Sequence, residues 1–398
     1  MAFGLVVLGL VSILSSPEPV RPGLEVLIRD SMHLVAGRRV GLVTNQGGID
    51  RAGAHAVDVL RAAGVNLTAL FSPEHGFRGT ADPGEKVAST VDRTTGLPIY
   101  SLYGSTAAPT DTMLSNVDVL LVDLPDVGTR YYTYISTAIE VMRSAVKHGR
   151  RVIILDRPNP ISGRVQGNLL DPAFRSFIGP LAVPMRHGMT LGEQARLANR
   201  ELEIGADLVV VPAQHWTRSM YGDATGIPFV PPSPNLQDLE ALIHYPGTCL
   251  FEGTALSVGR GTPAAYHQVG APWLDTTRVL ALVRGARLPG VVFEGVGFTP
   301  VRPGDAKFPN VALRGIRLRV TDREAYDPTR TAVVMLLAVR AVHPDQIGFI
   351  ERHFDLLAGG IRLRQAILAD RTAESIVSEW TSGRESFETR IRPFLIYR

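Results

Sequence analysis

The chain has 398 residues, of which 45% are hydrophobic, and its formal net charge at pH 7 is only +3. A chain of this length favours two domains, each large enough to bury a core of its own. Basic residues are spread along the chain without interleaved aromatic side chains, which excludes nucleic acid as an expected partner, and the single cysteine, Cys249, excludes an internal disulfide framework.

The N-terminal residues, 1–22, are interpreted as a signal peptide followed by a short proline-containing linker. Residues 3–14 are apolar and have the length of a signal-peptide h-region, and they are too short to span a bilayer. No Lys or Arg precedes them, and residues 12–16 form only a weak cleavage site, so a disordered or strand-forming tail is the alternative. We expect export to the periplasm or the cell exterior, with the cytoplasm as the alternative, and no stable membrane span.

Residues 23–245 alternate short apolar runs with helical patterns. Strands are expected at 40–44, 66–71, 97–103, 117–124, 151–155 and 206–211, and helices at 54–63 and 135–147. A further helix is expected to begin at Thr190, because Glu193 lies three residues later and completes a capping box. Near-continuous apolar strands that alternate with helices are typical of a parallel sheet covered on both faces, so the predicted fold class is α/β.

Residues 246–398 have a different pattern. Strand-like runs at 290–298 and 313–321 are mixed with helical stretches at 277–286, 329–343 and 372–380. This mixture predicts a smaller α+β domain. The run Cys249 to Phe251, which ends in Glu252, is interpreted as a strand followed by a carboxylate.

Four of the predicted strands of the first domain end in polar turns. The carboxyl ends of parallel strands meet at one edge of a sheet, where ligands bind in open α/β folds. We therefore expect a ligand site at this edge. The turns contribute Asn45 and Gln46 from the first strand, Glu74, His75 and Arg78 from the second, Asp123, Asp126, Arg130 and Tyr131 from the fourth, and Arg157 and Asn159 from the fifth.

Carboxylates dominate the polar residues of these turns. Cleavage of a glycosidic bond needs a carboxylic acid that protonates the leaving oxygen, and usually a second carboxylate that activates water or attacks the sugar. The candidates are Glu74, Asp126 and Glu252, with helix capping as the alternative role for each. Tyr131 offers a flat face for a sugar ring or a core position. His187 precedes a helix N-terminus, where it either binds an anionic group or caps the turn.

Several other motifs are excluded by their context. Residues 259–264 fit the pattern G-x-G-x-x-A, but no helical pattern follows them, as a dinucleotide site would require. The sequence contains no Walker A loop, no H-E-x-x-H and no G-x-S-x-G. Carboxylates and histidines are too scattered to predict a metal site, and no cofactor is expected.

A set of motifs, taken in order, resembles one known family. The motifs are Thr44-Asn45-Gln46, residues 72–79 (SPEHGFRG), residues 123–134, residues 156–160 (DRPNP), residues 186–190 (RHGMT), Pro232-Ser233-Pro234-Asn235, residues 251–262 with Arg260 and Thr262, residues 270–273 (GAPW) and His353-Phe354-Asp355. From about Gly23 to the C-terminus, the sequence is similar to the exo-β-N-acetylmuramidases of the NamZ-like family, formerly DUF1343 and now glycoside hydrolase family 171.

This resemblance implies a Rossmann-like N-terminal domain, a smaller C-terminal domain and an active site in the cleft between them. It also implies release of N-acetylmuramic acid (MurNAc) from the non-reducing ends of peptidoglycan fragments. Glu74 lies at the family's Pro-Glu-His-Gly position and is our choice for the general acid. For the second role the choice stays open between Asp126 and Glu252.

The remaining site residues are assigned to substrate binding. Arg130, Arg157 and Arg260 are candidates for the lactyl carboxylate of MurNAc, because a guanidinium can bind a carboxylate through two hydrogen bonds. The other assigned residues are Asn45, Gln46, His75, Arg78, Asp123, Tyr131, Asn159, His187, Asn235 and Thr262. Residues 265–267 (AYH) depart from the family's Pro-Phe-Glu or Pro-Phe-Gln step. The alternative functions are a non-catalytic muropeptide-binding protein and a metal-dependent hydrolase, and the oligomeric state is not predicted.

Overall fold

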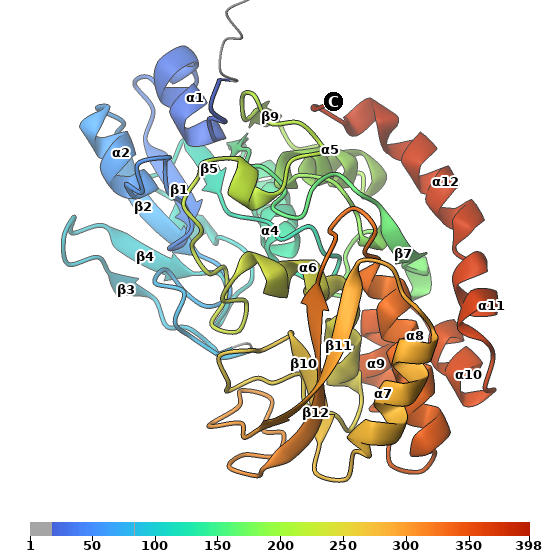
Figure 1. Ribbon diagram of the computed structural model, residues 1–398. Helices are drawn as coiled ribbons and strands as arrows, with labels where there is room; N and C mark the ends of the chain where they lie inside the picture. Colours follow the sequence, from blue (N-terminus) through green and yellow to red (C-terminus); the bar gives the residue numbers. More distant parts are fainter. Residues whose placement is uncertain (1–17, 83) are drawn as a thin grey trace, which may run out of the picture.

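The structure, a computed structural model, describes residues 18–82 and 84–398 (Figure 1). The apolar segment interpreted as a signal peptide, residues 3–14, lies outside the described residues. Within the described ranges, no helix combines the length and the apolar character needed to cross a membrane.

The first part of the chain forms a seven-stranded sheet in the order β3-β4-β2-β1-β5-β6-β9. All neighbouring strands are parallel except β3 and β4. The chain moves outward in one direction from β1 to β2 and β4, and in the other direction from β5 to β6 and β9. This is the Rossmann strand order, and its reversal lies between β1 and β5. The strands are β1 (Val40–Thr44), β2 (Leu67–Ser72), β3 (Thr90–Val91), β4 (Pro98–Ser101), β5 (Val119–Asp123), β6 (Arg151–Leu155) and β9 (Leu208–Val211).

Helices cover both faces of this sheet, as the apolar strands predict. On one face, α1 (Gly23–Asp30) and α2 (Ala56–Ala62) pack against one set of alternating strand residues, such as Val40 and Leu42. On the other face, α4 (Tyr134–Lys147) and α5 (Leu191–Glu201) pack against the other set, such as Val43 and Val122. The predicted capping box of α5 is present between Thr190 and Glu193. The short helix α3 (Asp111–Leu114) precedes β5, and β7 (Gln166–Leu169) pairs with β8 (Pro184–Arg186).

The second part is a three-stranded antiparallel sheet with helices, in the order β10-β12-β11. Its strands are β10 (Gln268–Ala271), β11 (Val291–Phe298) and β12 (Leu313–Val320). Its helices are α6 (Leu239–Thr248), α7 (Thr276–Gly285), α8 (Pro328–Val342), α9 (Glu351–Ala358), α10 (Arg362–Leu368), α11 (Ala373–Ser378) and α12 (Thr381–Ile391). One continuous hydrophobic core extends from the large sheet into these helices.

The strand predicted around Cys249 to Phe251 is wrong. These residues belong to the 3₁₀ helix η4 (Cys249–Gly253), which continues directly from α6. Cys249, Leu250 and Phe251 are all buried, so the segment shows no alternation between a buried and an exposed face. A short apolar run of this kind is equally compatible with a strand and with a buried helical turn.

After α12 the chain returns to the large sheet. The hydroxyl of Tyr397 donates a 2.6 Å hydrogen bond to Oδ2 of Asp156, just beyond β6. The same hydroxyl accepts a 2.9 Å hydrogen bond from the backbone N–H of Ala213, just beyond β9. The C-terminal end therefore lies at the top of the first domain in Figure 1, away from the small sheet.

Candidate active site

The polar turns after β2, β1, β5 and β6 lie at one edge of the large sheet, because these four strands are adjacent and parallel. This arrangement brings the loops that carry Asn45, Glu74, Asp126 and Arg157 to the same side of the domain. The second domain lies beside this edge (Figure 1). The edge has two distinct parts, one around Glu74 and one around Asp126.

Glu74 is held in place through both carboxylate oxygens. Oε1 accepts a 2.9 Å hydrogen bond from the backbone N–H of Gly84, and Oε2 accepts a 2.6 Å hydrogen bond from the hydroxyl of Thr133. The residue is only 7% exposed. Tyr103 lies nearby, where burial and, in second place, the Glu74 carboxylate raise the pKa of its phenol to about 12. Tyr103 therefore keeps its proton at neutral pH.

His75 sits in a left-handed backbone conformation, with φ of 69°. Its Nδ1 lies 2.8 Å from the carbonyl oxygen of Ala81, so Nδ1 carries a proton and donates it to that carbonyl. Burial is the largest of several effects that together lower the pKa of His75, and the nearby charge of Arg260 acts in the same direction. The imidazole is therefore neutral at pH 7, and its Nε2 can accept a hydrogen bond.

Glu252, Arg260 and Tyr266 form a hydrogen-bonded cluster on the second domain. Nε of Arg260 lies 2.5 Å from Oε1 of Glu252, and the hydroxyl of Tyr266 lies 2.8 Å from the same oxygen. Nη2 of Arg260 also donates to the Tyr266 hydroxyl, at 2.7 Å. Burial opposes the ionisation of Glu252, but the charge and hydrogen bond of Arg260, together with Tyr266, outweigh it and lower the pKa of Glu252. Glu252 is therefore ionised at neutral pH.

Lys307 fixes the loop that carries Glu252. Its ammonium group donates hydrogen bonds to the backbone carbonyls of Phe251, Glu252, Thr254 and Leu256, at distances between 2.7 and 3.3 Å. Burial lowers the pKa of Lys307 from its usual value. One ammonium group thus satisfies four backbone carbonyls and holds this segment in place.

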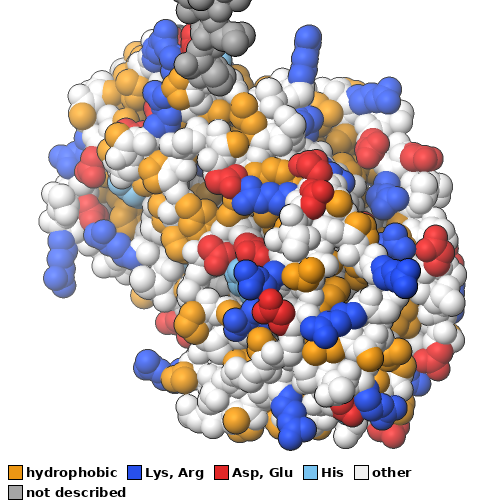
Figure 2. All heavy atoms as spheres, viewed as in Figure 1, with side chains coloured by type: hydrophobic (Ala, Val, Ile, Leu, Met, Phe, Trp, Pro, Cys, Tyr) orange, Lys and Arg blue, Asp and Glu red, His pale blue; other side chains and the backbone are white. Residues whose placement is uncertain are grey.

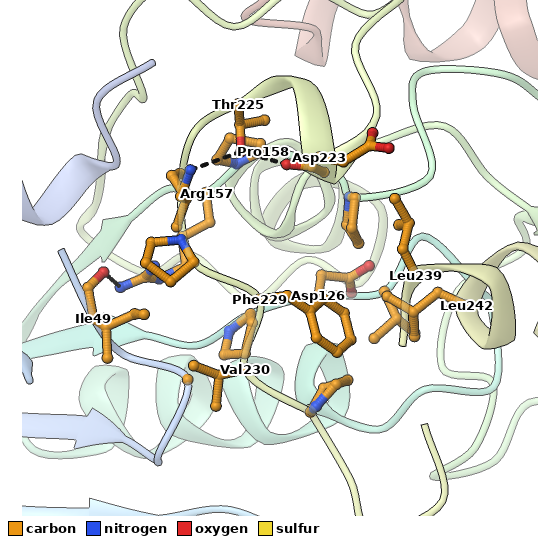
Figure 3. A pocket seen from close by; sticks show the side chains of 18 residues that line it. Ile49, Asp126, Arg157, Pro158, Asp223, Thr225, Phe229, Val230, Leu239 and Leu242 are labelled. Carbon is orange, nitrogen blue, oxygen red and sulfur yellow. Dashed lines mark hydrogen bonds between the residues drawn. The ribbon is translucent and has the colours of Figure 1, made fainter. Parts of the chain in front are cut away.

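A separate cavity of about 230 Å³ lies at the strand-order reversal between β1 and β5 (Figure 3). Its walls are mostly apolar, and Figure 3 shows the Asp126 carboxylate among the side chains of Phe229, Leu239 and Leu242. Pro232 is part of the wall of this cavity, whereas Glu74 is not. The side chain of Gln46 donates to the Pro231 carbonyl at 2.9 Å, and the hydroxyls of Tyr132 and Tyr134 donate to the Pro232 carbonyl.

Asp126, which lines this cavity, forms a buried pair with His187. Asp126 accepts hydrogen bonds from the backbone of Gly128 at 2.6 Å and from Gln194 at 3.1 Å, yet burial raises its pKa to about 6. Nδ1 of His187 accepts a 3.1 Å hydrogen bond from the Met189 N–H, and burial lowers the pKa of this imidazole to about 3. Neutral His187 therefore carries its proton on Nε2, which lies 3.7 Å from Oδ1 of Asp126.

Comparison with known proteins identifies the family. A family description for the N-terminal part of the exo-beta-N-acetylmuramidase NamZ matches residues 40–240, and the one for its C-terminal part matches residues 243–397. The chain belongs to the NamZ family. It is 40% identical over 381 residues to the peptidoglycan beta-N-acetylmuramidase NamZ of Bacillus subtilis (strain 168), which covers 95% of this chain and 91% of that protein.

Solved structures of the NamZ family, under its older name DUF1343, share the fold. Two such proteins from Bacteroides fragilis NCTC 9343 are each 31% identical to this chain, and each comparison covers 96% of this chain and 99% of the other. The TM-scores are 0.88 and 0.79. The Rossmann-like sheet and the smaller C-terminal part are therefore family features, in agreement with the resemblance seen in the sequence.

Within this fold of the NamZ family, two of the three arginines predicted to bind substrate are engaged mainly with protein groups. Arg157 donates to both carboxylate oxygens of Asp123, at 2.5 and 2.9 Å, and to the Ile49 carbonyl at 2.8 Å. Arg130 is 2% exposed and donates to the carbonyls of Asn168, Val183 and Leu357. Arg260 is the arginine that pairs with the candidate carboxylate Glu252, whereas Arg157 lines the cavity at Asp126.

Most of the other residues predicted to bind substrate are engaged with protein groups, and one lies at the surface. Asn45 donates to the Tyr134 hydroxyl at 2.7 Å, Asn159 donates to the Met189 carbonyl at 3.0 Å, and Thr262 closes a turn with Gly259. Tyr131 donates to the Pro246 carbonyl. Asn235 is 8% exposed in the loop before α6. The Arg78 side chain is 75% exposed and pairs with Asp92 at 3.7 Å, outside the carboxylate cluster.

Sequence analysis missed four polar residues that hold this NamZ site together: Thr133, Tyr103, Tyr266 and Lys307. Thr133 lies in the polar segment after β5, but nothing in that segment indicates its carboxylate partner, which lies 59 residues earlier in the chain. Tyr266 lies in the segment that departs from the family pattern. Its hydroxyl is a group that the phenylalanine of that pattern lacks. Lys307 lies in a loop that has no pattern, so nothing in the local sequence signals its role.

Proposed function

We propose that Glu74 and Glu252 are the two carboxylates with which this member of the exo-β-N-acetylmuramidase family hydrolyses its substrate. As a glycoside hydrolase of this family, the protein acts on peptidoglycan. The proposal is that it removes MurNAc from the non-reducing end of soluble peptidoglycan fragments. Glu74 acts as the general acid, and Glu252 acts as the base for water or as the stabiliser of the oxocarbenium-like state.

The observation that carries this assignment is the pairing of Glu252 with Arg260 and Tyr266. A carboxylate that assists water or stabilises positive charge must be ionised, and these two partners lower the pKa of Glu252 against the effect of burial. Arg260 also lies near enough to His75 for its charge to lower the pKa of that imidazole. The Glu252 cluster and the Glu74 loop are thus neighbours across the boundary between the two parts of the chain.

Asp126 fits the second role less well. Its pKa of about 6 leaves part of the population protonated near neutral pH. Asp126 lies in the cavity that Pro232 lines, and Glu74 is not among the residues that line it. We propose that this mostly apolar cavity receives a neutral portion of the substrate and takes no part in bond cleavage.

Arg260 is our choice for the lactyl carboxylate of MurNAc. Its Nε and Nη2 are used by Glu252 and Tyr266, but among the described residues no acceptor contacts Nη1. His75 offers Nε2 as an acceptor for a sugar hydroxyl. These two groups supply a charged and a neutral contact near the proposed carboxylates.

The test is release of free MurNAc from the disaccharide MurNAc-GlcNAc, compared among wild type, Glu252→Gln and Asp126→Asn. Glu252→Gln is expected to lower kcat by roughly 10²–10⁴-fold, as loss of an acid–base group does. Asp126→Asn is expected to keep kcat within about tenfold. Near-normal turnover by Glu252→Gln, combined with an inactive and folded Asp126→Asn, would reverse the assignment.

A further inference from the structure

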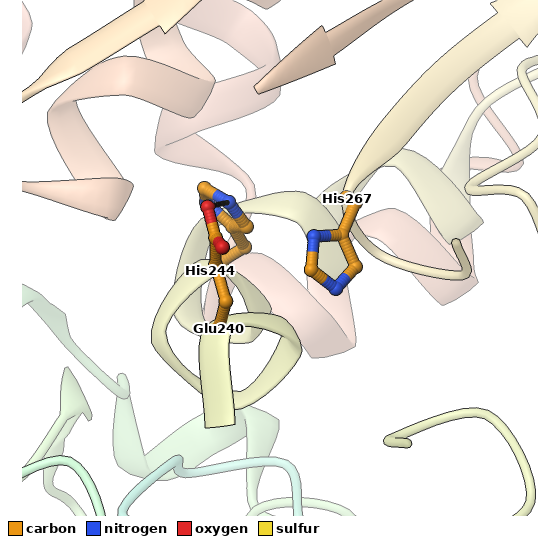
Figure 4. Close-up of side chains that lie close together, drawn as sticks. All are labelled: Glu240, His244 and His267. Atoms are coloured by element: carbon orange, nitrogen blue, oxygen red, sulfur yellow. Dashed lines mark ion pairs between the residues drawn. The ribbon is translucent and has the colours of Figure 1, made fainter. Parts of the chain in front are cut away.

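We propose that Glu240, His244 and His267 bind a Zn²⁺ ion between helix α6 and the start of strand β10 (Figure 4). Each residue offers one ligand atom, and these atoms all lie within 4.8 Å of one another. Glu240 and His244 are four residues apart on α6, so they share one face of the helix. His267 directly precedes β10 and reaches the same point from a different element.

The spacing of the first two ligands suits zinc. Oε1 of Glu240 lies 3.5 Å from Nε2 of His244, which is longer than a good N–H···O hydrogen bond. Tetrahedral zinc with bonds of about 2.0–2.1 Å holds two neighbouring ligand atoms about 3.4 Å apart. The observed distance therefore matches the edge of a zinc tetrahedron, and only His267 has to move closer.

The buried nitrogen of His244 is the second observation. His244 is 0% exposed, and its Nε2 has no hydrogen-bond partner in the described part of the chain. Buried polar atoms nearly always have a partner, because burial without one costs free energy. A metal ion at this position would be that partner.

The two imidazoles are also oriented as metal ligands are. Nδ1 of His244 lies 2.9 Å from the hydroxyl of Tyr326, and Nε2 of His267 lies 3.0 and 3.1 Å from the carboxylate oxygens of Asp238. A ligating histidine usually donates its other ring N–H to such a group, which fixes the tautomer and orients the ring. In this arrangement Nε2 of His244 and Nδ1 of His267 keep their lone pairs for the metal.

Two imidazoles and one carboxylate favour Zn²⁺ over Mg²⁺ or Ca²⁺, which prefer sets made of oxygen ligands. The fourth position is left for water. The ion can reach the site from solvent, since the Glu240 and Asp238 side chains are 40% and 53% exposed. Figure 2 shows acidic side chains beside a histidine near the middle of this face, over α6.

The position of the site indicates a structural role. Leu239 and Leu242 of α6 line the cavity at Asp126, whereas Glu240 faces β12 and accepts a 2.8 Å hydrogen bond from the Val320 N–H. An ion bound here would tie α6 to the small sheet. It would also fix His267 and so stabilise the adjacent Tyr266. The hydroxyl of Tyr266 contacts Glu252.

The experiment uses the untagged full chain, stripped with EDTA and dialysed, so that no engineered histidines compete. Calorimetric titration with ZnCl₂ is expected to show one equivalent bound, and thermal unfolding is expected to show a Tm rise of about 2–5 °C when free Zn²⁺ is a hundredfold above its Kd. Co²⁺ in place of Zn²⁺ is expected to give the visible absorption of a tetrahedral nitrogen–oxygen site.

His267→Gln and Glu240→Gln are the test variants, because both side chains reach the surface and their loss leaves no large cavity. Each is expected to weaken Zn²⁺ binding at least tenfold and to abolish the Tm rise. His148→Gln, at the residue that follows α4 in the first domain, is the matched control and should behave as wild type. Absence of stoichiometric binding by wild type, or unchanged binding by both variants, would overturn the proposal. These readouts do not depend on hydrolysis, so they are independent of the roles proposed for Glu74 and Glu252.

Discussion

The hydroxyl of Thr133 donates a 2.6 Å hydrogen bond to Oε2 of Glu74, which lies 59 residues earlier in the chain. Thr133 occupies the N-cap position of α4 but makes no side-chain capping hydrogen bond to that helix. A residue type that usually caps a helix here serves the carboxylate of another loop. Thr133 therefore positions Glu74 and leaves α4 without a side-chain cap.

Substitution of Thr133 should therefore affect the catalytic rate more than the stability of the fold. Thr133→Val removes the donor to Glu74 while no capping hydrogen bond is lost, so we expect kcat on MurNAc-GlcNAc to fall roughly 10- to 100-fold with little change in Tm. Thr133→Ser keeps a hydroxyl and should retain most of the activity. A Thr133→Val protein that loses stability but keeps kcat would show that the contact is structural only.

Glu74→Gln is expected to lower kcat by roughly 10²–10⁴-fold, because the amide cannot protonate the leaving oxygen. The variant should fold, since its side-chain oxygen can still accept from Gly84 and its amide can donate to the Thr133 hydroxyl. Arg78→Gln is the matched control from the same loop, and its exposed side chain should leave kcat unchanged. Aryl muramides that differ in leaving-group pKa give the sharpest readout, because good leaving groups should restore the rate.

Tyr266→Phe is expected to shift the acid limb of the kcat/KM profile to higher pH. The Tyr266 hydroxyl is one of the groups that lower the pKa of Glu252, and the limb reports the protonation of the group that must be ionised. Its loss leaves Arg260 as the remaining strong partner, so the rate at neutral pH should change by less than about tenfold. An unshifted profile would mean that Glu252 is not the titrating group.

Asp126 should make stability depend on pH in a defined direction. Burial raises its pKa in the folded state to about 6, so its contribution to stability is full below its unfolded pKa and is lost as the pH rises through about 6. Asp126→Asn does not titrate. Between pH 4 and pH 8, the wild-type protein should therefore lose up to about 3 kcal/mol more of its free energy of unfolding than the variant loses. Urea unfolding at both pH values measures this, with the exposed Asp345→Asn as the control.

Arg130→Leu tests whether this buried arginine is structural. Its guanidinium donates to three backbone carbonyls from distant parts of the chain, and leucine would leave these acceptors without their donor. We expect a loss of about 3–5 kcal/mol in the free energy of unfolding, as for other disrupted buried charged networks. The KM of the folded fraction should stay near the wild-type value, whereas Arg260→Gln should raise KM. A raised KM without loss of stability in Arg130→Leu would instead place Arg130 at the substrate.

The fold was predictable where local patterns decide it. The strands at 40–44 and 151–155 were predicted with the bounds that β1 and β6 have, because each is an apolar run closed by polar turn residues. The capping box at Thr190 was equally clear. The helix α6 was not predicted, since it contains Pro246 and is buried on most sides, so it shows no amphipathic period.

The site was predictable only as a set of loops. The strand ends indicated which edge would carry Glu74 and Asp126, but the partners that decide each residue's role come from far along the chain. Arg130 is an example, because its carbonyl acceptors lie 38, 53 and 227 residues away. The pair Arg157–Asp123, whose members lie 34 residues apart, likewise depends on the fold, whereas Glu252 and Arg260 stand only eight residues apart in one motif.

The return of the chain to the first sheet has a consequence for biosynthesis. Asp156 receives the Tyr397 hydroxyl from 241 residues later, and the backbone N–H groups of Ile396 and Tyr397 donate to Glu193. During translation these residues emerge from the ribosome after every strand of both sheets has been made. The first domain therefore completes these hydrogen bonds late in synthesis, and a nascent chain that lacks residues 396 and 397 would hold Asp156 and Glu193 without these donors.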